Sequence, residues 1–315
     1  MNIVFMGTPN FSVRILEAVH KEYGVDLVVT QPDKLVGRKK ILTFSPIKEK
    51  ALELGIEVFQ PVKMKEDYNR ILEVKPDIII TAAYGQMIPN EVIDFPRLGA
   101  INVHGSLLPL LRGGAPIQRA IKRLYNTTGI SIMYMAYKMD SGDVISQRSI
   151  RIMPNFTSGI LFEKLSILGR DLLMETLPSI IEGSNKRIPQ ENHLITYAYN
   201  LKREEEKINW DLTMLEIDAH VRAFSPEPSC YTTIDGKNLK VLSVEMFPCE
   251  NFEEVHSKDP NGMIVKVFKE SFGVKCSNGV IKITKVQLEG KTKQTVKVFL
   301  NGAGRNLIAE QKQFK

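Results

Sequence analysis

The sequence predicts an α/β protein with an N-terminal, mostly parallel sheet flanked by helices and a smaller β-barrel domain after it. In the first half of the chain, short apolar runs alternate with segments of helical spacing, an order typical of a parallel sheet covered by helices. In the last third, short strand-like runs are separated by Gly and Asp/Asn turns, which is typical of a small barrel. The length of 315 residues also exceeds one usual compact core, which favours two domains.

Apolar periodicity predicts the elements of the first domain in order. The run at 77–81 is almost continuously apolar, which is typical of a strand buried on both faces. Residues 11–20 show helical spacing soon after a strand that ends before Gly7. The other strands are expected at 3–6, 25–30, 57–59, 100–103, 129–136 and 144–152, and the other helices at 47–54, 65–74 and 158–181.

A polar, charged segment at 197–206 is interpreted as a linker, so the predicted domains are 1–196 and 207–315. The dipeptides Asp235-Gly236 and Asn278-Gly279 are of the kind that tight turns require, and they separate neighbouring strands of the second domain. A helix is expected at 210–224, and strands are expected at 230–234, 240–244, 263–268, 273–276 and 280–287.

Composition places the chain among ordinary globular proteins. Hydrophobic residues make up 43% of it and charged residues 25%, which excludes disordered and collagen-like classes. The first residues carry no cationic lead and only a short apolar run, so we expect no signal peptide, no membrane contact and a cytoplasmic location. Cys230, Cys249 and Cys276 are widely spaced, and neither a disulfide framework nor a zinc site is expected.

The net charge of +6 is concentrated in two segments. Residues 34–50 hold six cations against the single anion Glu49, and residues 281–300 hold five lysines against Glu289. Two basic surfaces suit a polyanion such as nucleic acid, although for either run alone a solvated face is the commoner interpretation.

The loop after the first strand has the place of a dinucleotide-binding loop but not its glycines. Pro9 and Ser12 stand where the second and third glycines of a G-x-G-x-x-G pattern would be. The proline ring blocks the close approach of a pyrophosphate, so a nicotinamide-dependent oxidoreductase is disfavoured.

Asn102 and His104 stand two residues apart at the end of a predicted buried strand. In an extended chain such residues point to the same side, and ligands of open parallel sheets bind at the carboxyl ends of strands. An amide beside an imidazole can hold a developing oxyanion and move a proton. Asp140 is the best partner for the imidazole, with Asp143 as the alternative. Each residue alone is more often structural, but together they predict a candidate site for acyl-transfer or amide-type chemistry.

Several longer motifs, taken together and in order, resemble the 10-formyltetrahydrofolate-dependent formyltransferase family. Within that family the resemblance is strongest to the branch that acts on methionyl-tRNA. The motifs are NVHGSLLP at 102–109, GGAPIQRA at 113–120, FMGTPNFSV at 5–13, QPDKLVGRKKI at 31–41, SPIK at 45–48, AAYGQMIP at 82–89, MDSGD at 139–143 and INWDLTMLEIDAHVRAFSPEP at 208–228.

The resemblance implies a Rossmann-like catalytic domain and an OB-like second domain that adds tRNA contacts. It assigns Asn102, His104 and Asp140 to catalysis and requires no metal. The residues that it implies in folate binding are Ser106, Leu107, Leu108, Pro109, Tyr84, Gly85, Gln86, Met87 and Ile88. Those that it implies in tRNA binding are Arg38, Lys39 and Lys40, in a loop that the family inserts.

The implied reaction moves the formyl group of 10-formyltetrahydrofolate to the amino group of methionyl-initiator tRNA, in a monomer that needs no protein partner. The basic segments favour this reaction over formylation of a small amine, such as an amino sugar or a glycinamide nucleotide. A non-catalytic RNA-binding protein is a further alternative, and it would require the three residues to be idle. The sequence departs from the family where Leu110 and Leu111 replace a basic and an aromatic residue, and where Asn10 replaces aspartate.

Overall fold

The computed structural model describes residues 1–37, 40–247 and 258–315. These residues form two compact units, and the chain passes finally from the first to the second between Asn200 and Leu201. Within the described ranges, none of the helices combines the length and apolar character that crossing a membrane requires. The first unit comprises Met1–Pro116, Thr127–Arg151 and Leu161–Asn200, and the second comprises Ile117–Asn126, Ile152–Ile160 and Leu201–Lys315.

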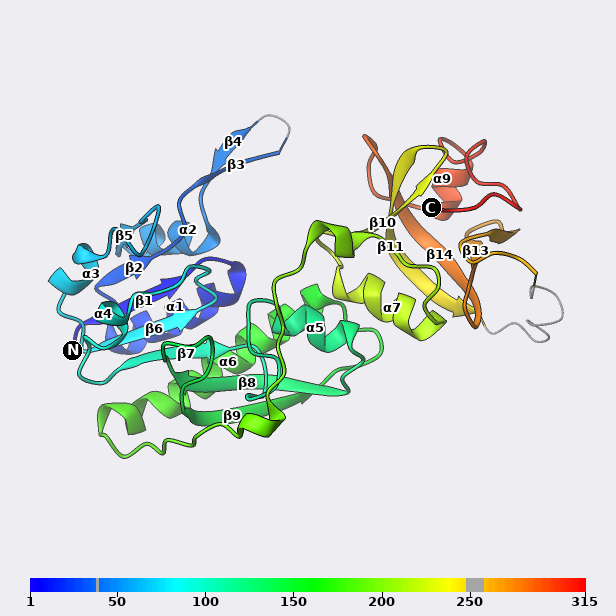
Figure 1. The fold of residues 1–315 in the computed structure, drawn as a ribbon. Coiled ribbons are helices and arrows are strands. Elements are labelled where there is room, and N and C mark those ends of the chain that lie inside the picture. The colour runs from blue at the N-terminus through cyan, green and yellow to red at the C-terminus, as the bar shows by residue number, and fades with distance from the viewer. Residues whose placement is uncertain (38–39, 248–257) are drawn as a thin grey trace. The chain divides into compact units, whose positions relative to one another are not determined.

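Among the described residues, a seven-stranded sheet forms the centre of the first unit (Figure 1). Its order is β5-β2-β1-β6-β7-β8-β9. Neighbouring strands from β5 to β7 are parallel, whereas β8 is antiparallel to β7 and β9 is antiparallel to β8. The predicted mostly parallel α/β fold is therefore confirmed. The strands are β1 (Ile3–Gly7), β2 (Leu27–Val29), β5 (Glu57–Phe59), β6 (Ile78–Ala82), β7 (Ala100–His104), β8 (Thr127–Tyr134) and β9 (Val144–Arg151).

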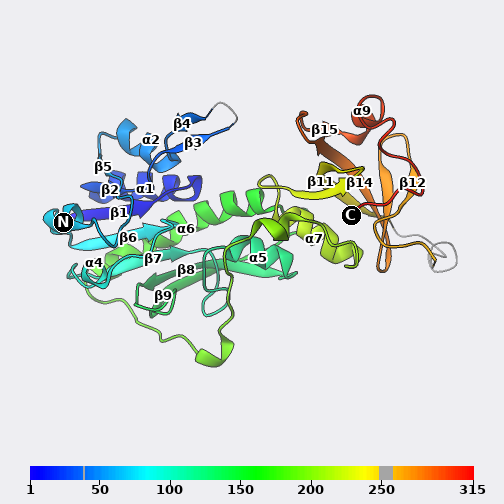
Figure 2. The same ribbon diagram turned by 45° about the horizontal axis from the view of Figure 1, so that its top comes forward.

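Helices α1 (Asn10–Tyr23) and α6 (Ser158–Ile181) run along one face of this sheet (Figure 1 and Figure 2). Phe11 and Phe162 join them through an edge-to-face contact, with ring centroids 6.3 Å apart. A Cβ on Gly169 would lie only 2.9 Å from Val103 Cγ1, so the glycine lets α6 approach β7 closely. Helix α2 (Pro46–Glu53) begins after Ser45, whose hydroxyl accepts a hydrogen bond from the Lys48 N–H and so caps the helix.

The opposite face of the sheet carries a large cluster of buried apolar side chains. Alternate strand residues, such as Val4 and Met6, pack there against Ile71 of α3 (Asn69–Glu73) and Val92 of α4 (Asn90–Ile93). Because β1, β2 and β6 are buried on both faces, their sequences are continuous apolar runs rather than alternating ones.

The helix expected at 65–74 is shorter in the structure and begins only at Asn69. Tyr68 has φ −134°, outside the helical region, and its side chain packs against the apolar cluster. Just before the expected start, the backbone N–H of Met64 donates to the side chain of Gln86, a tertiary contact. Tertiary contacts therefore replace the first turn, and the prediction was wrong there. The short helix α4 was not expected, because so few turns show no periodicity.

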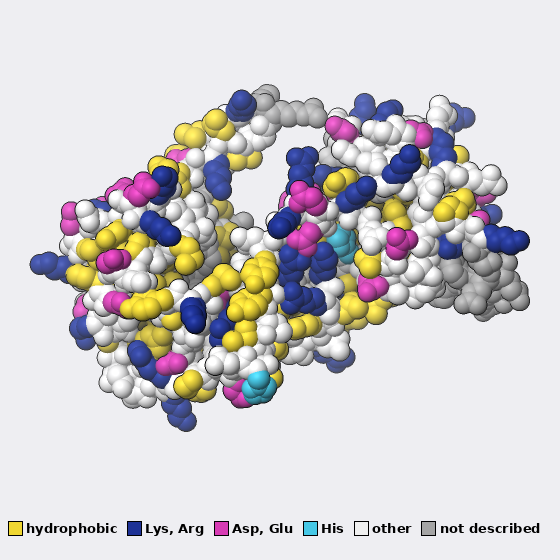
Figure 3. All heavy atoms as spheres, in the orientation of Figure 1, with side chains coloured by type: hydrophobic (Ala, Val, Ile, Leu, Met, Phe, Trp, Pro, Cys, Tyr) yellow, Lys and Arg dark blue, Asp and Glu magenta, His cyan; other side chains and the backbone are white. Residues whose placement is uncertain are grey.

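The basic segment expected as a loop contains a two-stranded hairpin, β3 (Lys34–Val36) and β4 (Ile41–Thr43). Gly37 has φ +73° at its turn, a conformation that glycine adopts without strain. Leu35 and Ile41 are each more than half exposed, and Figure 3 shows hydrophobic side chains exposed along this hairpin.

Of the three cations expected to contact tRNA, Lys40 lies at this turn and is exposed. Arg38 and Lys39 lie outside the described residues, as does Cys249.

The second unit is built on an antiparallel sheet with the order β10-β11-β14-β13-β12, and β15 pairs with β14. Each strand expected in this domain is present to within a few residues. Helix α7 (Met214–Ala223) begins with a capping box, in which Thr213 and Glu216 bond each other's backbone N–H groups. The elements are β10 (Cys230–Ile234), β11 (Lys237–Phe247), β12 (Ile264–Val267), β13 (Phe272–Cys276), β14 (Gly279–Leu288), β15 (Gln294–Thr295), α5 (Pro116–Lys122) and α9 (Val296–Leu300).

Closure of this sheet into a barrel requires a link between its edge strands β10 and β12. Among the described strands these two do not pair directly. Instead, Lys315 exchanges two backbone hydrogen bonds with Thr233 of β10, and residues 311 and 312 bond Ile264 of β12. The last residues of the second unit thus link the two edge strands by backbone hydrogen bonds. The sheet is therefore joined edge to edge through this segment, as in a partly open version of the predicted OB-like barrel.

Candidate functional site

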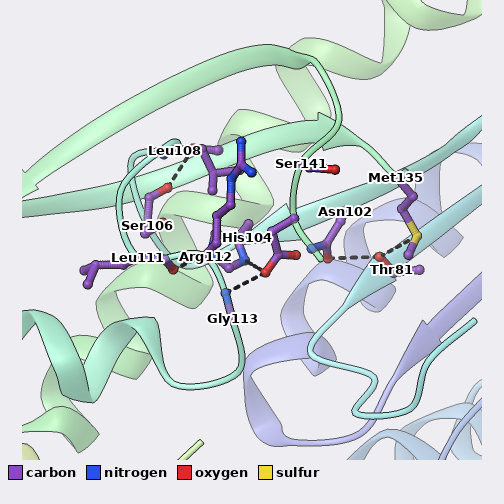
Figure 4. Close-up of polar contacts among 12 residues, drawn as sticks. Thr81, Asn102, His104, Ser106, Leu108, Leu111, Arg112, Gly113, Met135 and Ser141 are labelled. Atoms are coloured by element: carbon purple, nitrogen blue, oxygen red, sulfur yellow. Dashed lines mark hydrogen bonds and ion pairs between the residues drawn. The ribbon is translucent and has the colours of Figure 1, made fainter. Parts of the chain in front are cut away.

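The carboxyl ends of β6 and β7 meet at one edge of the first unit's sheet. The two strands pair in parallel register, with Thr81 opposite Asn102. The Thr81 hydroxyl lies 2.9 Å from Asn102 Oδ1 and donates a hydrogen bond to it (Figure 4). Because the amide oxygen faces Thr81, the amide nitrogen of the half-buried Asn102 lies on the side of His104, as Figure 4 shows.

His104 is the last residue of β7 and is only 5% exposed. Its Nε2 lies 3.1 Å from the backbone oxygen of Leu111. A carbonyl oxygen can only accept a hydrogen bond, so Nε2 carries a hydrogen and donates it. The second ring nitrogen, Nδ1, lies 3.7 Å from Asp140 Oδ2. Leu111 therefore fixes the ring so that Nδ1 faces the carboxylate.

Asp140 lies in the connection between β8 and β9. Its Oδ2 accepts a hydrogen bond of 2.7 Å from the backbone N–H of Gly113 (Figure 4). Its φ of +49° is left-handed, which costs a non-glycine residue about 1–2 kcal/mol and persists only where the surroundings hold it. Of the two aspartates that the sequence left open, Asp140 is the one whose carboxylate meets the imidazole. Asp143 contributes its backbone oxygen, which accepts from the Tyr134 N–H.

The structure thus brings an amide, an imidazole and a carboxylate to one sheet edge. Asn102 and His104 project from one side of β7, and Asp140 reaches the imidazole from the next connection. Such an arrangement can stabilise negative charge that develops on a carbonyl oxygen, and it can relay a proton between two nitrogens.

Polar side chains on neighbouring strands bind the backbone of the segment from Ser106 to Pro109. Strand register places His104, Ser131 and Gln147 side by side on β7, β8 and β9. The Ser131 hydroxyl donates to the Ser106 backbone oxygen at 2.7 Å and accepts from the Leu108 N–H at 3.0 Å. Gln147 donates to the Leu108 backbone oxygen at 2.8 Å. These bonds fix the backbone of the segment beside the catalytic candidates.

The side chains of this segment divide between interior and surface. Ser106 is fully buried, and its hydroxyl donates to the Leu110 backbone oxygen. Leu108 is buried with Met133 and Val144. Leu107 and Pro109 are half-buried. A ligand at this segment would therefore meet Leu107 and Pro109 rather than Ser106 or Leu108.

The segment from Tyr84 to Ile88 divides in the same way. Gly85 and Met87 are exposed, whereas Tyr84 and Ile88 are buried in the apolar cluster. The Gln86 amide is used internally, since it bonds the backbone of Met64 and of Pro61. Of the five residues implied in folate binding here, Gly85 and Met87 are the ones that a ligand could reach.

Tyr84 turns its side chain into the core, where it is 4% exposed. Its hydroxyl has no hydrogen-bond partner among the described residues, and burial raises the pKa of Tyr84 above its usual value. Its backbone oxygen, by contrast, accepts from the Thr8 hydroxyl at 2.8 Å. Tyr84 therefore shapes the edge through its backbone.

Tyr84→Phe is expected to raise the free energy of unfolding by about 1 kcal/mol, because a buried hydroxyl without a partner carries a desolvation cost that phenylalanine lacks. Turnover should be unchanged. Urea unfolding of both proteins measures the difference, and a loss of folate affinity in the variant would show instead that the hydroxyl serves a ligand.

Leu111, which replaces an aromatic residue of the family, is 1% exposed and has φ +60°. Its side chain packs inside while its backbone oxygen bonds His104. Leu110, which replaces a basic residue, is half-buried, and its backbone oxygen accepts from Ser106. At both positions the contact that supports the site comes from the backbone, so it survives the change of side chain.

Sequence reasoning missed Thr81, Ser131 and Gln147. A signal existed for Thr81, which is the polar residue that ends the apolar run of β6. Ser131 and Gln147 gave no signal, because their role follows from strand register across an antiparallel edge.

Comparison with known proteins gives two family matches. The formyl transferase model matches residues 1–177, and the formyl transferase C-terminal domain model matches residues 200–304. A methionyl-tRNA formyltransferase of Macrococcus caseolyticus is 44% identical over 308 residues, 97% of each chain. The corresponding protein of Lysinibacillus sphaericus is 46% identical over 310 residues, again 97% of each.

Among solved structures, an N-formyltransferase from Helicobacter canadensis, in complex with folinic acid and dTDP-3-aminofucose, matches with a TM-score of 0.67. The match covers 89% of this chain and 98% of that one at 20% identity, so it shows a shared fold.

Proposed function

Because this chain belongs to the formyl transferase family, we propose that it transfers the formyl group of 10-formyltetrahydrofolate to the free amino group of methionyl-initiator tRNA. The product is N-formylmethionyl-tRNA, which serves translation initiation. The observation that carries the proposal is the contact of His104 with Asp140 at the sheet edge. It is supported by the two methionyl-tRNA formyltransferases described above, which match 97% of the length of this chain.

The formyl donor supplies an activated carbonyl carbon, and the chain's residues act on the charge and the proton that move during transfer. As the amine attacks, negative charge develops on the formyl oxygen. The Asn102 amide and the protonated His104 ring donate hydrogen bonds to that oxygen, and each such donor contributes about 3–4 kcal/mol. Asp140 stabilises the positive ring and helps to move the proton of the amine to the leaving nitrogen.

The surfaces that would hold the two substrates follow from exposure. The folate would lie against Gly85, Met87, Leu107 and Pro109. These are the residues that a ligand can contact in the two segments beside the three catalytic candidates. The tRNA would contact Arg38, Lys39 and Lys40 of the basic segment. We expect a monomer in the cytoplasm, where translation initiates.

The decisive experiment supplies the purified chain with 10-formyltetrahydrofolate and either methionyl-initiator tRNA or a small amine. We expect rapid formylation of the charged tRNA and far slower formylation of an amino-sugar nucleotide or a glycinamide nucleotide. The opposite order would favour the small-amine alternative. Tight tRNA binding without any formyl transfer would favour a non-catalytic RNA-binding protein.

Replacing Arg38, Lys39 and Lys40 together with alanine is expected to weaken use of the tRNA and to lower its salt dependence. Each lost phosphate contact reduces the slope of log K against log salt by about 0.9, so the triple variant should lose about 2–3 units of slope. Titrations of tRNA affinity from low to high salt measure this. Lys21→Ala, at an exposed position on α1, is the matched control, and an unchanged slope in the triple variant would exclude the hairpin from tRNA contact.

A further inference from the structure

Gln190 makes a set of hydrogen bonds around Asp140 that no sequence motif indicated. It lies after α6, 50 residues beyond Asp140. Its Oε1 accepts from Arg112 Nε at 3.0 Å and from Arg112 Nη2 at 2.8 Å. Its Nε2 donates to the backbone oxygens of Asp140 at 2.9 Å and of Gly142 at 2.8 Å.

The bonding capacity of the Gln190 amide is fully used, because the oxygen accepts twice and the nitrogen donates twice. The orientation of the amide is also unambiguous. A guanidinium can only donate, and backbone oxygens can only accept, so a flipped amide would oppose donor to donor and acceptor to acceptor. Glutamate has the same shape and would keep the bonds to Arg112, but it has no N–H groups for the Asp140 loop.

Both partners of Gln190 adjoin the Asp140 carboxylate. On one side the amide binds the backbone of Asp140 itself. On the other it binds Arg112, the residue before Gly113, whose N–H donates to Asp140 Oδ2 at 2.7 Å. Arg112 is 6% exposed, and its backbone is paired with the backbone of Thr196 and of Ala198. Gln190 therefore couples the Asp140 loop to the segment that holds its carboxylate.

The Asp140 loop needs such external support. Asp140 has φ +49°, and a Cβ at Gly142 would clash with the Tyr134 backbone oxygen, so the loop passes tightly over β8. A strained, non-glycine residue stays in place only where its surroundings hold it there. The Nε2 group of Gln190 donates to the backbone oxygens of Asp140 and Gly142, so it holds this loop at two points.

We propose that Gln190 is a positioning residue for formyl transfer, a role that rests on the proposed function. It holds the Asp140 carboxylate against His104 without touching either substrate. Loss of its two donors should let Asp140 leave the left-handed conformation and draw its carboxylate away from the imidazole. The effect should fall on the rate of the chemical step and leave substrate binding nearly intact.

Gln190→Glu tests the proposal, because it removes the two donors and keeps the acceptors for Arg112. We expect kcat for formylation of methionyl-initiator tRNA to fall by about 10–100-fold, since a misplaced catalytic group costs this much, while KM for either substrate changes by less than about threefold. Gln190→Met, which loses both sets of bonds, should lose at least as much. If both variants are folded and turn over like the wild type, the proposal is wrong.

A double-variant cycle with Asp140→Ala separates positioning from a general loss of stability. If Gln190 acts through Asp140, then Gln190→Glu should cost less than about threefold in the Asp140→Ala background, measured in single turnovers at high enzyme concentration. Costs that multiply in full would show that Gln190 acts independently of Asp140, and would overturn the proposal.

Gln60→Glu is the matched control, since Gln60 is also a half-buried glutamine of the first unit whose Nε2 donates to a backbone oxygen, that of Gln31, and it bonds neither Arg112 nor the Asp140 loop. Its kcat should stay near that of the wild type. The same kcat loss in both variants would point to an unspecific effect of a buried charge and would count against the proposal. A wild-type chain that transfers no formyl group would instead refute the proposed function itself.

Discussion

Replacing His104 with alanine is expected to lower kcat for formylation by about 10⁴-fold, because the ring serves both as an oxyanion donor and in proton transfer. The structure gives the ring one fixed arrangement. Its Nε2 is committed to the Leu111 backbone oxygen, so the nitrogen that faces Asp140 is the one left to act on substrate. Alanine removes this nitrogen and leaves nothing in its place. Rapid-quench single turnovers at saturating folate and tRNA measure the loss.

The control for this prediction must separate chemistry from folding, because His104 is 5% exposed and its removal leaves a cavity and an unpaired carbonyl. We expect a destabilisation of about 1–3 kcal/mol for the carbonyl alone. His104→Gln can still donate to Leu111 but cannot carry a positive charge, so it should recover stability and remain nearly as slow as alanine. Affinity for tRNA should be near that of the wild type in both variants. Recovery of turnover by glutamine would contradict a charged ring in the mechanism.

The sequence predicts the frame of the site well because the frame depends on local pattern. Consecutive buried strands of a parallel sheet have their carboxyl ends at one edge, which is enough to place Asn102 and His104 beside the end of β6. Residues two apart on a strand share a side, so the pairing of amide and imidazole could be expected from spacing alone.

The supporting contacts could not be predicted, because they depend on loops whose backbone no local pattern specifies. Leu111 and Asp140 both have left-handed φ values, +60° and +49°, which no periodicity of the sequence indicates. Gln190 reaches Asp140 from 50 residues away. Tyr84 shows a different limit, since the motif implies a residue beside the ligand but does not tell which way its side chain points, and after β6 it turns into the core.

The hairpin β3–β4 shows a third kind of limit. Its strands are three residues each, and alternation over so short a run cannot be told from an irregular loop. The sequence shows the charges of this segment directly, but it does not predict the conformation of its backbone. Electrostatic inferences about the partner therefore stood on firmer ground than inferences about the shape presented to it.

The second large effect is expected at Asn102. The charge of the side chain that replaces the neutral amide decides which variant is slower. Asn102→Ala is expected to lower kcat about 10²–10³-fold, the cost of one lost oxyanion donor. Asn102→Asp should be slower still, because it loses the same N–H group and adds negative charge beside an oxygen that is becoming negative. The aspartate keeps an acceptor for the Thr81 hydroxyl, so its loss cannot be assigned to a broken anchor.

Thr81→Val completes the series, since it leaves the amide in place and removes only the hydroxyl that orients it. We expect a smaller loss, about tenfold, because the amide can then rotate and present its oxygen to the developing charge for part of the time. The order of single-turnover rates should be Thr81→Val, then Asn102→Ala, then Asn102→Asp as the slowest. An aspartate variant as fast as the alanine variant would mean that no negative charge develops near this side chain, and the oxyanion role of Asn102 would have to be abandoned.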